Sequence, residues 1–345
     1  MASEASSSAE PISVSIVVPT RNRASLLARA LASLKAITIP RGLTCEIVVV
    51  DNASSDATAE EVLKASAGSP APIRYVCEKR TGVAQARNTG VSAAQGTWIA
   101  FFDDDETAAP DWLEYLLLAA EVTGASCVGG AYRLDLSQDE LSRLSPTCRA
   151  ILGEKQTSGG LCRCTRRNRP GTGNALVSRD VFLRVGGFDE MLARGGSDWD
   201  FFARAERLGY QAWYTPDAII YHHVPSHRMT QEYLLWASLR HGASLAFLDL
   251  RERGTWGVAV LAIFRAVQAI GINLPIFVLH AALAQSPALL GRKCLLWRAI
   301  GYSRQTLRIL APRMLPQAAF FESIEFHREL EAVATRVLPG GRAQE

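Results

Sequence analysis

The segment GTWIAFFDDDET (residues 96–107) decides how this chain can fold. Four consecutive apolar residues, Ile99–Phe102, suit a strand buried on both faces, and three carboxylates, Asp103–Asp105, follow them at once. Adjacent carboxylates repel one another, and a buried carboxylate is costly unless a partner compensates its charge. The segment therefore predicts a buried strand that ends at a polar edge, where the three charges meet either solvating water or a bound cation.

Three more strand-like segments precede this one, and helix-like segments separate them. Strands are predicted over residues 13–18, 46–51, 73–78 and 97–102, and helices over residues 24–35, about 56–65 and 82–94. Alternating strands and helices predict a parallel sheet, in which ligands collect beyond the carboxyl ends of the strands. Three of those ends are polar: residues 19–22 (PTRN), 51–52 (DN) and 103–105 (DDD). The repeated polar ends predict one ligand site along one edge of the sheet.

The second half of the chain changes character twice. Residues 166–173 (RRNRPGTG) show no clean period and are predicted to be a mobile loop. After the loop, strands are predicted over 174–178 and 218–223, and helices over 179–187 and 197–210. From about residue 229 the pattern is helical. The predicted parts are therefore a disordered tail (1–11), an α/β domain (12–228) and a helical C-terminal region (229–345).

Apolar spacing assigns an inward face to two of the predicted helices, because residues three or four positions apart lie on one side of a helix. In the helix over residues 24–35, the predicted inward residues are Leu26, Ala30, Leu31 and Leu34. In the helix over residues 197–210, they are Phe201, Phe202, Ala205 and Leu208.

The composition is that of a globular protein. The chain has 345 residues, of which 48% are hydrophobic and 21% are charged, and its net charge of +3 gives no reason to expect a nucleic-acid partner. Seven scattered cysteines and an N-terminus without a signal peptide predict reduced thiols and a cytoplasmic location. Cys162 and Cys164 form a single Cys-x-Cys pair, and without a second pair this is a weak zinc motif.

Five ordered segments give the chain a family resemblance. They are SIVVPTRNRASLLARALASL, EIVVVDNASSDAT, GVAQARNTGVSAAQGTWIAFFDDD, GNALVSRDVFLRVGGFDE and GGSDWDFFARAERLGYQAWYTPDAIIYHH. Over roughly residues 12–225 the chain resembles family-2 glycosyltransferases. That resemblance implies a GT-A fold, with a Rossmann-like, mostly parallel central sheet flanked by helices, and a nucleotide-diphosphate sugar as the donor. The helical C-terminal region is then an appendage to this fold.

The resemblance gives the three carboxylates a role. Asp103 and Asp105 look like the DxD pair, which holds a divalent metal together with the sugar nucleotide, and oxygen ligands suit both Mn²⁺ and Mg²⁺. Alternation along an extended segment points these two side chains the same way and Asp104 aside. Asp104 is assigned to the donor-binding residues.

The same resemblance implies the other donor-binding residues. They are Pro19, Thr20 and Arg21 in the nucleotide pocket, Asp51 at the base, and Arg87 near the diphosphate. Without the resemblance, Arg87 is better read as a surface arginine of a helix. The segment after Asp51 is rich in helix-capping residues, so Ser55 or Asp56 is expected to cap the next helix.

The segment GGSDWD (residues 195–200) carries the predicted catalytic residue. An acceptor hydroxyl is a weak nucleophile and needs a general base within hydrogen-bond reach. The family pattern is Glu-Asp, with the Asp as base in inverting members, and here the pair is Ser197-Asp198. Asp198 is therefore the predicted base, with Asp200 as the second candidate and helix capping as the structural alternative.

Acceptor and metal contacts are also predicted near these segments. Trp199 and Asn174 are assigned to acceptor binding, although Trp199 is equally suited to core packing. By resemblance to some relatives, His223 is a candidate third metal ligand beside Asp103 and Asp105. The basic residues Arg163, Arg166, Arg167 and Arg169 either close over the donor diphosphate or contact a phosphate-bearing acceptor, or they are simply solvated.

The C-terminal region contains a 19-residue segment without a formal charge, residues 266–284, which is long enough to span a bilayer. Interspersed polar residues and flanking basic residues instead favour an amphipathic segment that lies on the inner face of the cell membrane, with contacts through residues 256–300. A soluble helical subdomain or a dimer interface is the alternative.

The leading functional hypothesis is an inverting, metal-dependent glycosyltransferase for hexosyl or deoxyhexosyl transfer. It would use a nucleotide-diphosphate sugar and an acceptor hydroxyl of a glycan or lipid-linked saccharide, as in polysaccharide biosynthesis. One alternative is a non-catalytic protein with the same fold, acting in binding or as a membrane scaffold. A sugar-nucleotide pyrophosphorylase fits less well, because the segment PTRNRAS (residues 19–25) lacks a glycine- and lysine-bearing phosphate loop.

Overall fold

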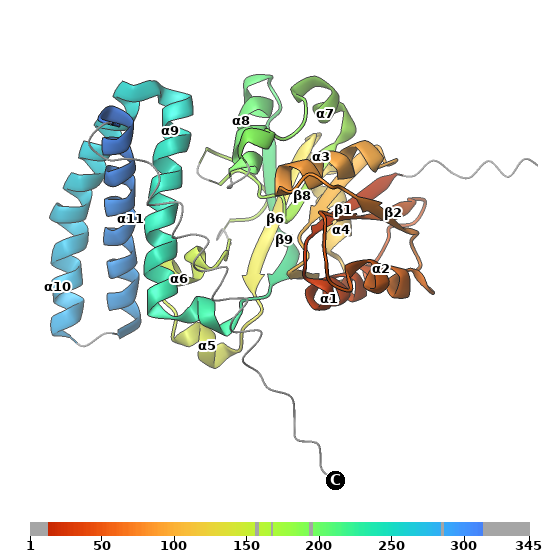
Figure 1. Cartoon of the computed structure of the whole chain (residues 1–345), viewed down its shortest axis with the longest axis horizontal. Helices are drawn as coiled ribbons and strands as arrows, with labels where there is room; N and C mark the ends of the chain where they lie inside the picture. Colours follow the sequence, from red (N-terminus) through yellow and green to blue (C-terminus); the bar gives the residue numbers. More distant parts are fainter. Residues whose placement is uncertain (1–12, 156–158, 167, 193–195, 284–285, 313–345) are drawn as a thin grey trace, which may run out of the picture. The chain divides into compact units, whose positions relative to one another are not determined.

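The computed structural model describes residues 13–155, 159–166, 168–192, 196–283 and 286–312. The predicted tail (1–11), Arg167 of the predicted basic loop and the last part of the predicted helical region (313–345) lie outside the described residues. The chain divides into two compact units, one that reaches Leu234 and one that begins at Leu235. Figure 1 shows strands and helices in the first unit and helices in the second.

In its described residues, the first unit is built on a nine-stranded sheet. The strand order is β3 (Ile73–Cys77), β2 (Cys45–Asp51), β1 (Val14–Thr20), β4 (Trp98–Phe102), β8 (Asn174–Ser178), β6 (Cys127–Leu134), β9 (Ala212–His222) and β5 (Glu106–Ala108), and β7 (Cys162–Arg163) also pairs with β9. Strands β3, β2, β1 and β4 are parallel, β8 runs against them, and β6 and β9 run with them again. The predicted mostly parallel sheet is confirmed. The carboxyl ends of β1, β2 and β4 therefore meet at one edge.

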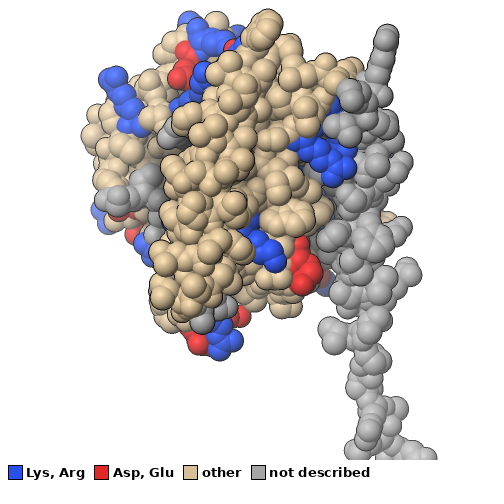
Figure 2. All heavy atoms as spheres, turned by 90° about the vertical axis from the view of Figure 1, so that its left-hand side faces the viewer, with Lys and Arg blue, Asp and Glu red and all other residues tan. Residues whose placement is uncertain are grey.

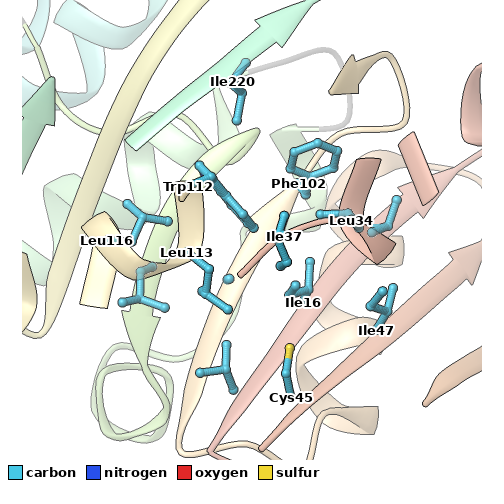
Figure 3. Close-up of a cluster of buried hydrophobic side chains, with 14 of the residues drawn as sticks. Ile16, Leu34, Ile37, Cys45, Ile47, Phe102, Trp112, Leu113, Leu116 and Ile220 are labelled. Atoms are coloured by element: carbon cyan, nitrogen blue, oxygen red, sulfur yellow. The ribbon is translucent and has the colours of Figure 1, made fainter. Parts of the chain in front are cut away.

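Helices cover both faces of this sheet. They are α1 (Ala24–Lys35), α2 (Thr58–Ser66), α3 (Val83–Ala93), α4 (Trp112–Thr123), α5 (Gln138–Ser142), α6 (Pro146–Ile151), α7 (Arg179–Val185) and α8 (Ser197–Arg207), with short 3₁₀ turns at Glu190–Leu192 and Ser226–Met229. Apolar residues of α1, α2 and α4 pack on one face, around Ile16, Phe102 and Trp112 (Figure 3). Apolar residues of α3, α7 and α8 pack on the other face. Every residue of β1 and β2 is buried because both faces are covered.

Two of the predicted inward positions are wrong. In α1 the buried residues are Leu27, Ala30, Leu31 and Leu34, so Leu27 takes the place predicted for Leu26. In the helix predicted over residues 197–210, Leu208 is 59% exposed, because α8 ends at Arg207 and the chain turns away. Phe201 is fully buried and stacks on Phe182 of α7 at a centroid distance of 4.8 Å, which anchors the start of α8.

The second unit is helical in its described part. Helix α9 (Gln231–Gln268) enters it, a π-helical turn (Ala269–Asn273) and α10 (Leu274–Ala282) continue the chain, and α11 (Ser286–Leu310) returns along them. Gly254 has a φ of 67°, in the left-handed region that favours glycine, and it breaks α9 into two helical segments. Inside the unit, Tyr302 is fully buried and donates a 2.9 Å hydrogen bond to Asp249.

Candidate active site

The edge of the sheet joins the ends of β1 and β4 through a buried hydrogen bond. Thr20 Oγ1, in the last residue of β1, donates to Asp104 Oδ2 at 2.8 Å. Asp104 follows β4 and is only 4% exposed. Two of the three polar strand ends that the sequence predicts to share a site therefore touch each other directly.

Arg23, at the start of α1, is the counter-ion of two of the three carboxylates. Its guanidinium lies 2.9 Å from Asp104 and 3.2 Å from Asp105. Burial raises the pKa of Asp104 to about 6, with Arg23 opposing and the neighbouring Asp105 adding to the shift. Burial also acts to raise the pKa of Asp105, but His222, Arg23 and Arg228 together outweigh it and hold that pKa at about 2. Asp105 is therefore an anion at neutral pH.

Asp103 has a separate counter-ion. Arg87, on α3, donates a 3.1 Å bond to Asp103 Oδ1, and the arginine side chain is 9% exposed while the aspartate side chain is 34% exposed. The strand ends at Phe102 and residues 104–105 form a turn, so the alternation expected along an extended segment does not continue. Asp104 and Asp105, and not Asp103 and Asp105, share one arginine.

A fourth acidic residue, Glu106, belongs to the same cluster and was not predicted. It is 4% exposed, and its Oε2 accepts a 3.1 Å bond from the backbone amide of Asp103. Burial and the charges of Asp103 and Asp105 raise its pKa well above the usual value. This environment therefore favours the protonated form of Glu106 over its carboxylate.

The loop Gly171–Gly173 lies between the carboxylates after β4 and the start of α8. A Cβ on Gly173 would stand 2.4 Å from Glu106 Oε1 and 3.0 Å from Asp103 Oδ2, so only glycine fits there. A Cβ on Gly171 would stand 2.8 Å from the Tyr132 hydroxyl and 3.9 Å from Asp198 Oδ2. The residues predicted for donor binding and for base catalysis thus flank one short loop.

Tyr132 holds this loop in place. Its hydroxyl donates a 2.8 Å bond to the carbonyl oxygen of Gly171. Burial raises the tyrosine pKa well above its usual value, and the charges of Glu106, Asp103 and Asp198 add to that shift. The hydroxyl therefore remains protonated and lies within the field of all three carboxyl groups.

The two candidate bases on α8 differ in their partners. Asp198 is partly exposed, and its Oδ1 accepts a 2.8 Å bond from the Trp199 amide. Asp200 is 8% exposed and bonds Arg204 Nε at 2.8 Å, one turn along the same helix. Asp198 Oδ2 lies near Gly171 of the glycine loop, whereas Asp200 is engaged in an ion pair with Arg204.

The residues predicted for acceptor contact have different surroundings. Trp199 is partly exposed, and the Arg169 guanidinium lies 4.3 Å from its ring centroid, so one aromatic face stacks on the basic loop. Asn174 is fully buried; its Nδ2 donates to the carbonyl oxygens of Ala131 and Ala218, and its Oδ1 accepts from Trp112. In this structure Asn174 is engaged in these buried hydrogen bonds, and the acceptor contact assigned to it stays a prediction.

The histidine that faces the carboxylates is His222. Its Nε2 lies 3.7 Å from Asp105 Oδ2, and its Nδ1 donates to the carbonyl oxygen of Leu152 at 3.0 Å, because a carbonyl oxygen can only accept. His223 instead lies 3.0 Å from Arg29 and 3.8 Å from Asp135, and only its backbone amide reaches Asp105. His223 follows the end of β9 with its ring beside Arg29 and Asp135, and the metal-ligand role assigned to it stays a prediction.

The remaining predicted donor residues line the same edge. Pro19 is buried within β1 and Arg21 is exposed. Asp51 is 4% exposed, with Oδ1 accepting from the Ser54 amide at 2.8 Å and Oδ2 accepting from the Tyr75 hydroxyl at 2.6 Å. Asp51 thus shapes the turn after β2. Asp56 accepts from the Thr58 amide at 3.2 Å, but the N-cap of α2 is Ala57, so neither Ser55 nor Asp56 occupies the predicted capping position.

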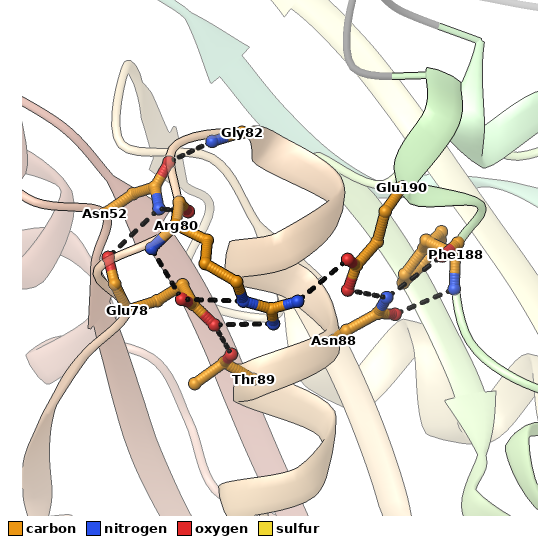
Figure 4. A network of polar contacts seen from close by, with 8 residues as sticks. All are labelled: Asn52, Glu78, Arg80, Gly82, Asn88, Thr89, Phe188 and Glu190. Carbon is orange, nitrogen blue, oxygen red and sulfur yellow. Dashed lines mark hydrogen bonds and ion pairs between the residues drawn. The ribbon is translucent and has the colours of Figure 1, made fainter.

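A polar network braces the helix that carries Arg87 (Figure 4). The Asn52 amide accepts from Gly82 and donates to the carbonyl oxygen of Arg80, which ties the end of β2 to the loop before α3. The Arg80 side chain bonds Glu78 and Glu190 at 3.0 Å each, and Glu78 also accepts from Thr89 of α3. These bonds fix the register of α3 against the sheet edge. The position of Arg87 follows from that register.

The ligand atoms at this edge determine what kind of divalent-metal site is possible. Asp103 and Asp105 supply hard oxygen atoms, but no three His, Cys, Asp or Glu side chains in the described part of the chain are grouped to enclose an ion. Such a site fits a metal whose shell is completed by substrate phosphates. It does not fit a metal held by protein ligands alone.

Comparisons with known proteins agree with this geometry. A family model described as Glycosyl transferase family 2 matches residues 15–183. The succinoglycan biosynthesis protein ExoM of Rhizobium meliloti (strain 1021) is 30% identical over 73% of this chain and 81% of that protein. Glycosyltransferase AglE of Haloferax volcanii is 28% identical over 60% of this chain and 65% of that protein.

Solved structures show the same fold. A mannosyltransferase of Pyrobaculum calidifontis, in complex with GDP-Man and Mn²⁺, matches with a TM-score of 0.59 and 22% identity, over 85% of this chain and 88% of that chain. Residues 1–349 of TarS from S. aureus match with a TM-score of 0.51 and 16% identity, over 87% and 91%. The predicted GT-A fold is confirmed.

Proposed function

The chain belongs to glycosyl transferase family 2, and we propose that it transfers a hexosyl or deoxyhexosyl group from a nucleotide-diphosphate sugar to a hydroxyl of a glycan or lipid-linked saccharide, with inversion at the anomeric carbon. Its relatives are named as glycosyltransferases, which favours transfer over the pyrophosphorylase and scaffold alternatives. ExoM is named for succinoglycan biosynthesis, and this supports a polysaccharide or its precursor as the acceptor class.

One observation carries the proposal. Gly173 of the Gly171–Gly173 loop lies next to Asp103, the partner of Arg87, and Gly171 of the same loop lies near Asp198. An in-line displacement needs the leaving group and the base on opposite sides of the reacting carbon. A sugar lying over the glycine loop would present its anomeric carbon between these two groups.

The chemistry assigned to the donor side is charge stabilisation. When the bond between the anomeric carbon and the diphosphate oxygen breaks, negative charge develops on the nucleotide. Arg87 and Arg23 carry fixed positive charge at this edge, in pairs with Asp103, Asp104 and Asp105. We infer that the diphosphate binds here and draws on these arginines as it leaves.

The chemistry assigned to Asp198 is proton transfer. Its carboxylate takes the proton of the acceptor hydroxyl while that oxygen attacks the anomeric carbon, so one glycosidic bond forms as the bond to the diphosphate breaks. Trp199 stands next to Asp198 with its ring partly exposed. We assign it to stacking on the acceptor sugar.

A divalent metal fits the donor side. Asp103 and Asp105 would hold Mn²⁺ or Mg²⁺, with the donor diphosphate completing the shell, and His222 Nε2 lies 3.7 Å from Asp105 Oδ2. When bound, such an ion neutralises charge on the leaving diphosphate. The mannosyltransferase that shares the fold was solved with GDP-Man and Mn²⁺, which is compatible with this assignment.

We also propose a cytoplasmic site of action. Cys77 lies exposed on β3 as a free thiol, and such thiols are typical of proteins from reducing compartments. The buried Cys164 has a pKa raised to about 11 by desolvation, so it is a poor metal ligand or nucleophile at neutral pH.

Calorimetry tests the donor assignment. UDP, GDP, dTDP and CMP are titrated into the wild-type chain and into Asp105→Ala, each with Mn²⁺, Mg²⁺ or EDTA. Metal-dependent binding of one nucleotide, lost in Asp105→Ala, is the expected result. A folded wild-type chain that binds none of them, and that neither transfers nor hydrolyses a sugar nucleotide, would favour the scaffold alternative.

A further inference from the structure

An uninterrupted apolar stripe runs along the outside of the second unit. Its residues recur every three or four positions on one side of the helical run from α9 to α10: Trp256, Val260, Ile263, Val267, Ile270, Leu274 and Val278. Their exposed fractions lie between 43% and 86%. Apolar residues at this spacing normally face a core. Here they face outward, and Figure 2 shows the corresponding broad surface with few charged side chains.

The stripe is also free of charge along its length. Between Trp256 and Gly291 the sequence has one charged residue, Arg265. That arginine points into the unit, 3.6 Å from Asp249 and 4.3 Å from the ring centroid of the buried Tyr302. The helical run Gln231–Ala282 reaches a mean hydropathy of 1.8 in an 18-residue window, of which 11% is buried. By length and composition, this run would suffice to cross a membrane.

The charge that surrounds the stripe is strongly positive. Residues 235–312 contain nine Arg and Lys against two Asp and Glu, a net charge of +7, whereas the whole chain carries +3. Two copies of such a unit would repel each other. An anionic surface would attract it.

We propose that this stripe docks on a lipid bilayer that contains anionic lipids, with α9 and α10 lying in the interface and not crossing it. A crossing is excluded by α11, which carries Arg292, Lys293, Arg298, Arg304 and Arg308 along its whole length. Arg292 bonds Asn273 at 3.2 Å, so α11 packs against the π-helical turn that precedes α10. If α10 and α11 entered the hydrocarbon core together, the basic residues of α11 would be buried in it at a high cost in free energy. Lying flat, the unit inserts only the stripe and keeps its basic residues at the headgroups.

The consequence for the reaction rests on the proposed function. An enzyme bound to an anionic bilayer would encounter lipid-linked saccharides by diffusion along the membrane surface. The docking itself does not depend on the chemistry of the first unit. A failure of vesicle binding and a failure of sugar transfer are therefore separate results.

Vesicle sedimentation tests the docking. The full chain is mixed with vesicles of phosphatidylcholine alone or of phosphatidylcholine with phosphatidylglycerol, at low and high salt. Wild type is expected to sediment with the anionic vesicles and to be partly released by salt. The double variant Ile263→Glu/Val267→Glu is expected to bind at least about tenfold more weakly. Leu63→Glu on α2 and Leu183→Glu on α7, each at a position 76% exposed, are matched controls and should bind like wild type.

A second measurement on the unaltered stripe guards against misfolding of the double variant. Trp256 is 86% exposed, so its fluorescence should be quenched by brominated lipids, and this quenching should disappear in Trp256→Phe. Wild type that remains in the supernatant with anionic vesicles overturns the proposal. So does a wild-type dimer that the double variant dissociates without any vesicle binding, since the stripe is then an interface between two copies.

Discussion

The carboxyl group of Glu106 accepts a 3.1 Å hydrogen bond from the backbone amide of Asp103, which joins a buried acid to a partly exposed one. The negative charge of four consecutive acidic residues is thus compensated in three ways. Arg87 pairs with Asp103, Arg23 pairs with Asp104 and Asp105, and burial favours the protonated form of Glu106. Donor binding would replace part of this arrangement.

The raised pKa of Glu106 predicts how the stability of the fold depends on pH. Its folded pKa lies well above the unfolded value of about 4.3, so the folded state holds the proton more tightly and loses that advantage as pH rises above about 4.3. Asp104, with a pKa of about 6, acts in the same direction. Between the unfolded and the folded pKa of each group, every pH unit lowers the free energy of unfolding by about 1.4 kcal/mol.

Glu106→Gln should remove the contribution of Glu106, because an amide keeps the shape and the acceptor oxygen without a charge. We expect its melting temperature relative to wild type to rise between pH 5 and pH 9, by roughly 2–4 °C for each kcal/mol. Scanning calorimetry in EDTA measures this difference. A difference that does not change with pH would show that Glu106 is ionised throughout.

Arg87 should matter for donor affinity more than for folding. Removing one charge-assisted bond to a phosphate costs about 1.5–3 kcal/mol, so Arg87→Gln should bind the preferred nucleoside diphosphate roughly 10- to 150-fold more weakly. Arg184→Gln, at an arginine 70% exposed on α7, is the control and should bind like wild type. Unchanged affinity in Arg87→Gln would remove that residue from the donor site.

Gly173 should not tolerate a side chain. The Cβ of Gly173→Ala would stand 2.4 Å from Glu106, so the loop or the carboxyl group must move, at a cost of about 1–3 kcal/mol. We expect a lower melting temperature and at least tenfold slower transfer. A displacement of roughly 1 Å in a catalytic group is enough to slow a reaction by that factor. Gly160→Ala has no atom within 4 Å of its Cβ and serves as the control. Wild-type activity in Gly173→Ala would mean that the loop lies outside the reacting centre.

Much of the fold follows from the sequence because its signals are local. Apolar runs predict β1, β2 and β4 to within a residue or two, and the helix over residues 24–35 coincides with α1. The carboxyl-edge rule brings Thr20 and Asp104 together before any coordinates are known. The two wrong inward positions, Leu26 and Leu208, lie at helix ends, where one residue of shift or an early stop changes the buried face.

The missed site residues depend on contacts that are distant in sequence. Glu106 lies at the start of β5 and Tyr132 within β6, in a region where no strand was predicted, and their roles arise from burial against Asp103 and Gly171. Arg23 is part of the segment PTRNRAS, but its role requires β4 to lie beside β1. His222 could have been preferred to His223 by alternation, since Ile220, two residues earlier, faces the core.

The proposed transfer reaction depends most directly on Asp198 as the general base. Asp198→Asn keeps the size of the side chain and an oxygen that can accept the Trp199 amide bond, so the fold and nucleotide affinity should be retained. Turnover with the preferred sugar nucleotide and its acceptor should fall by about 10²–10⁴-fold, while Asp180→Asn, at an aspartate 60% exposed on α7, should match wild type. Measuring kcat and nucleotide affinity together on these two variants decides the matter. If Asp198→Asn loses turnover but retains nucleotide affinity, Asp198 is supported as the general base. Full turnover in Asp198→Asn would contradict that role.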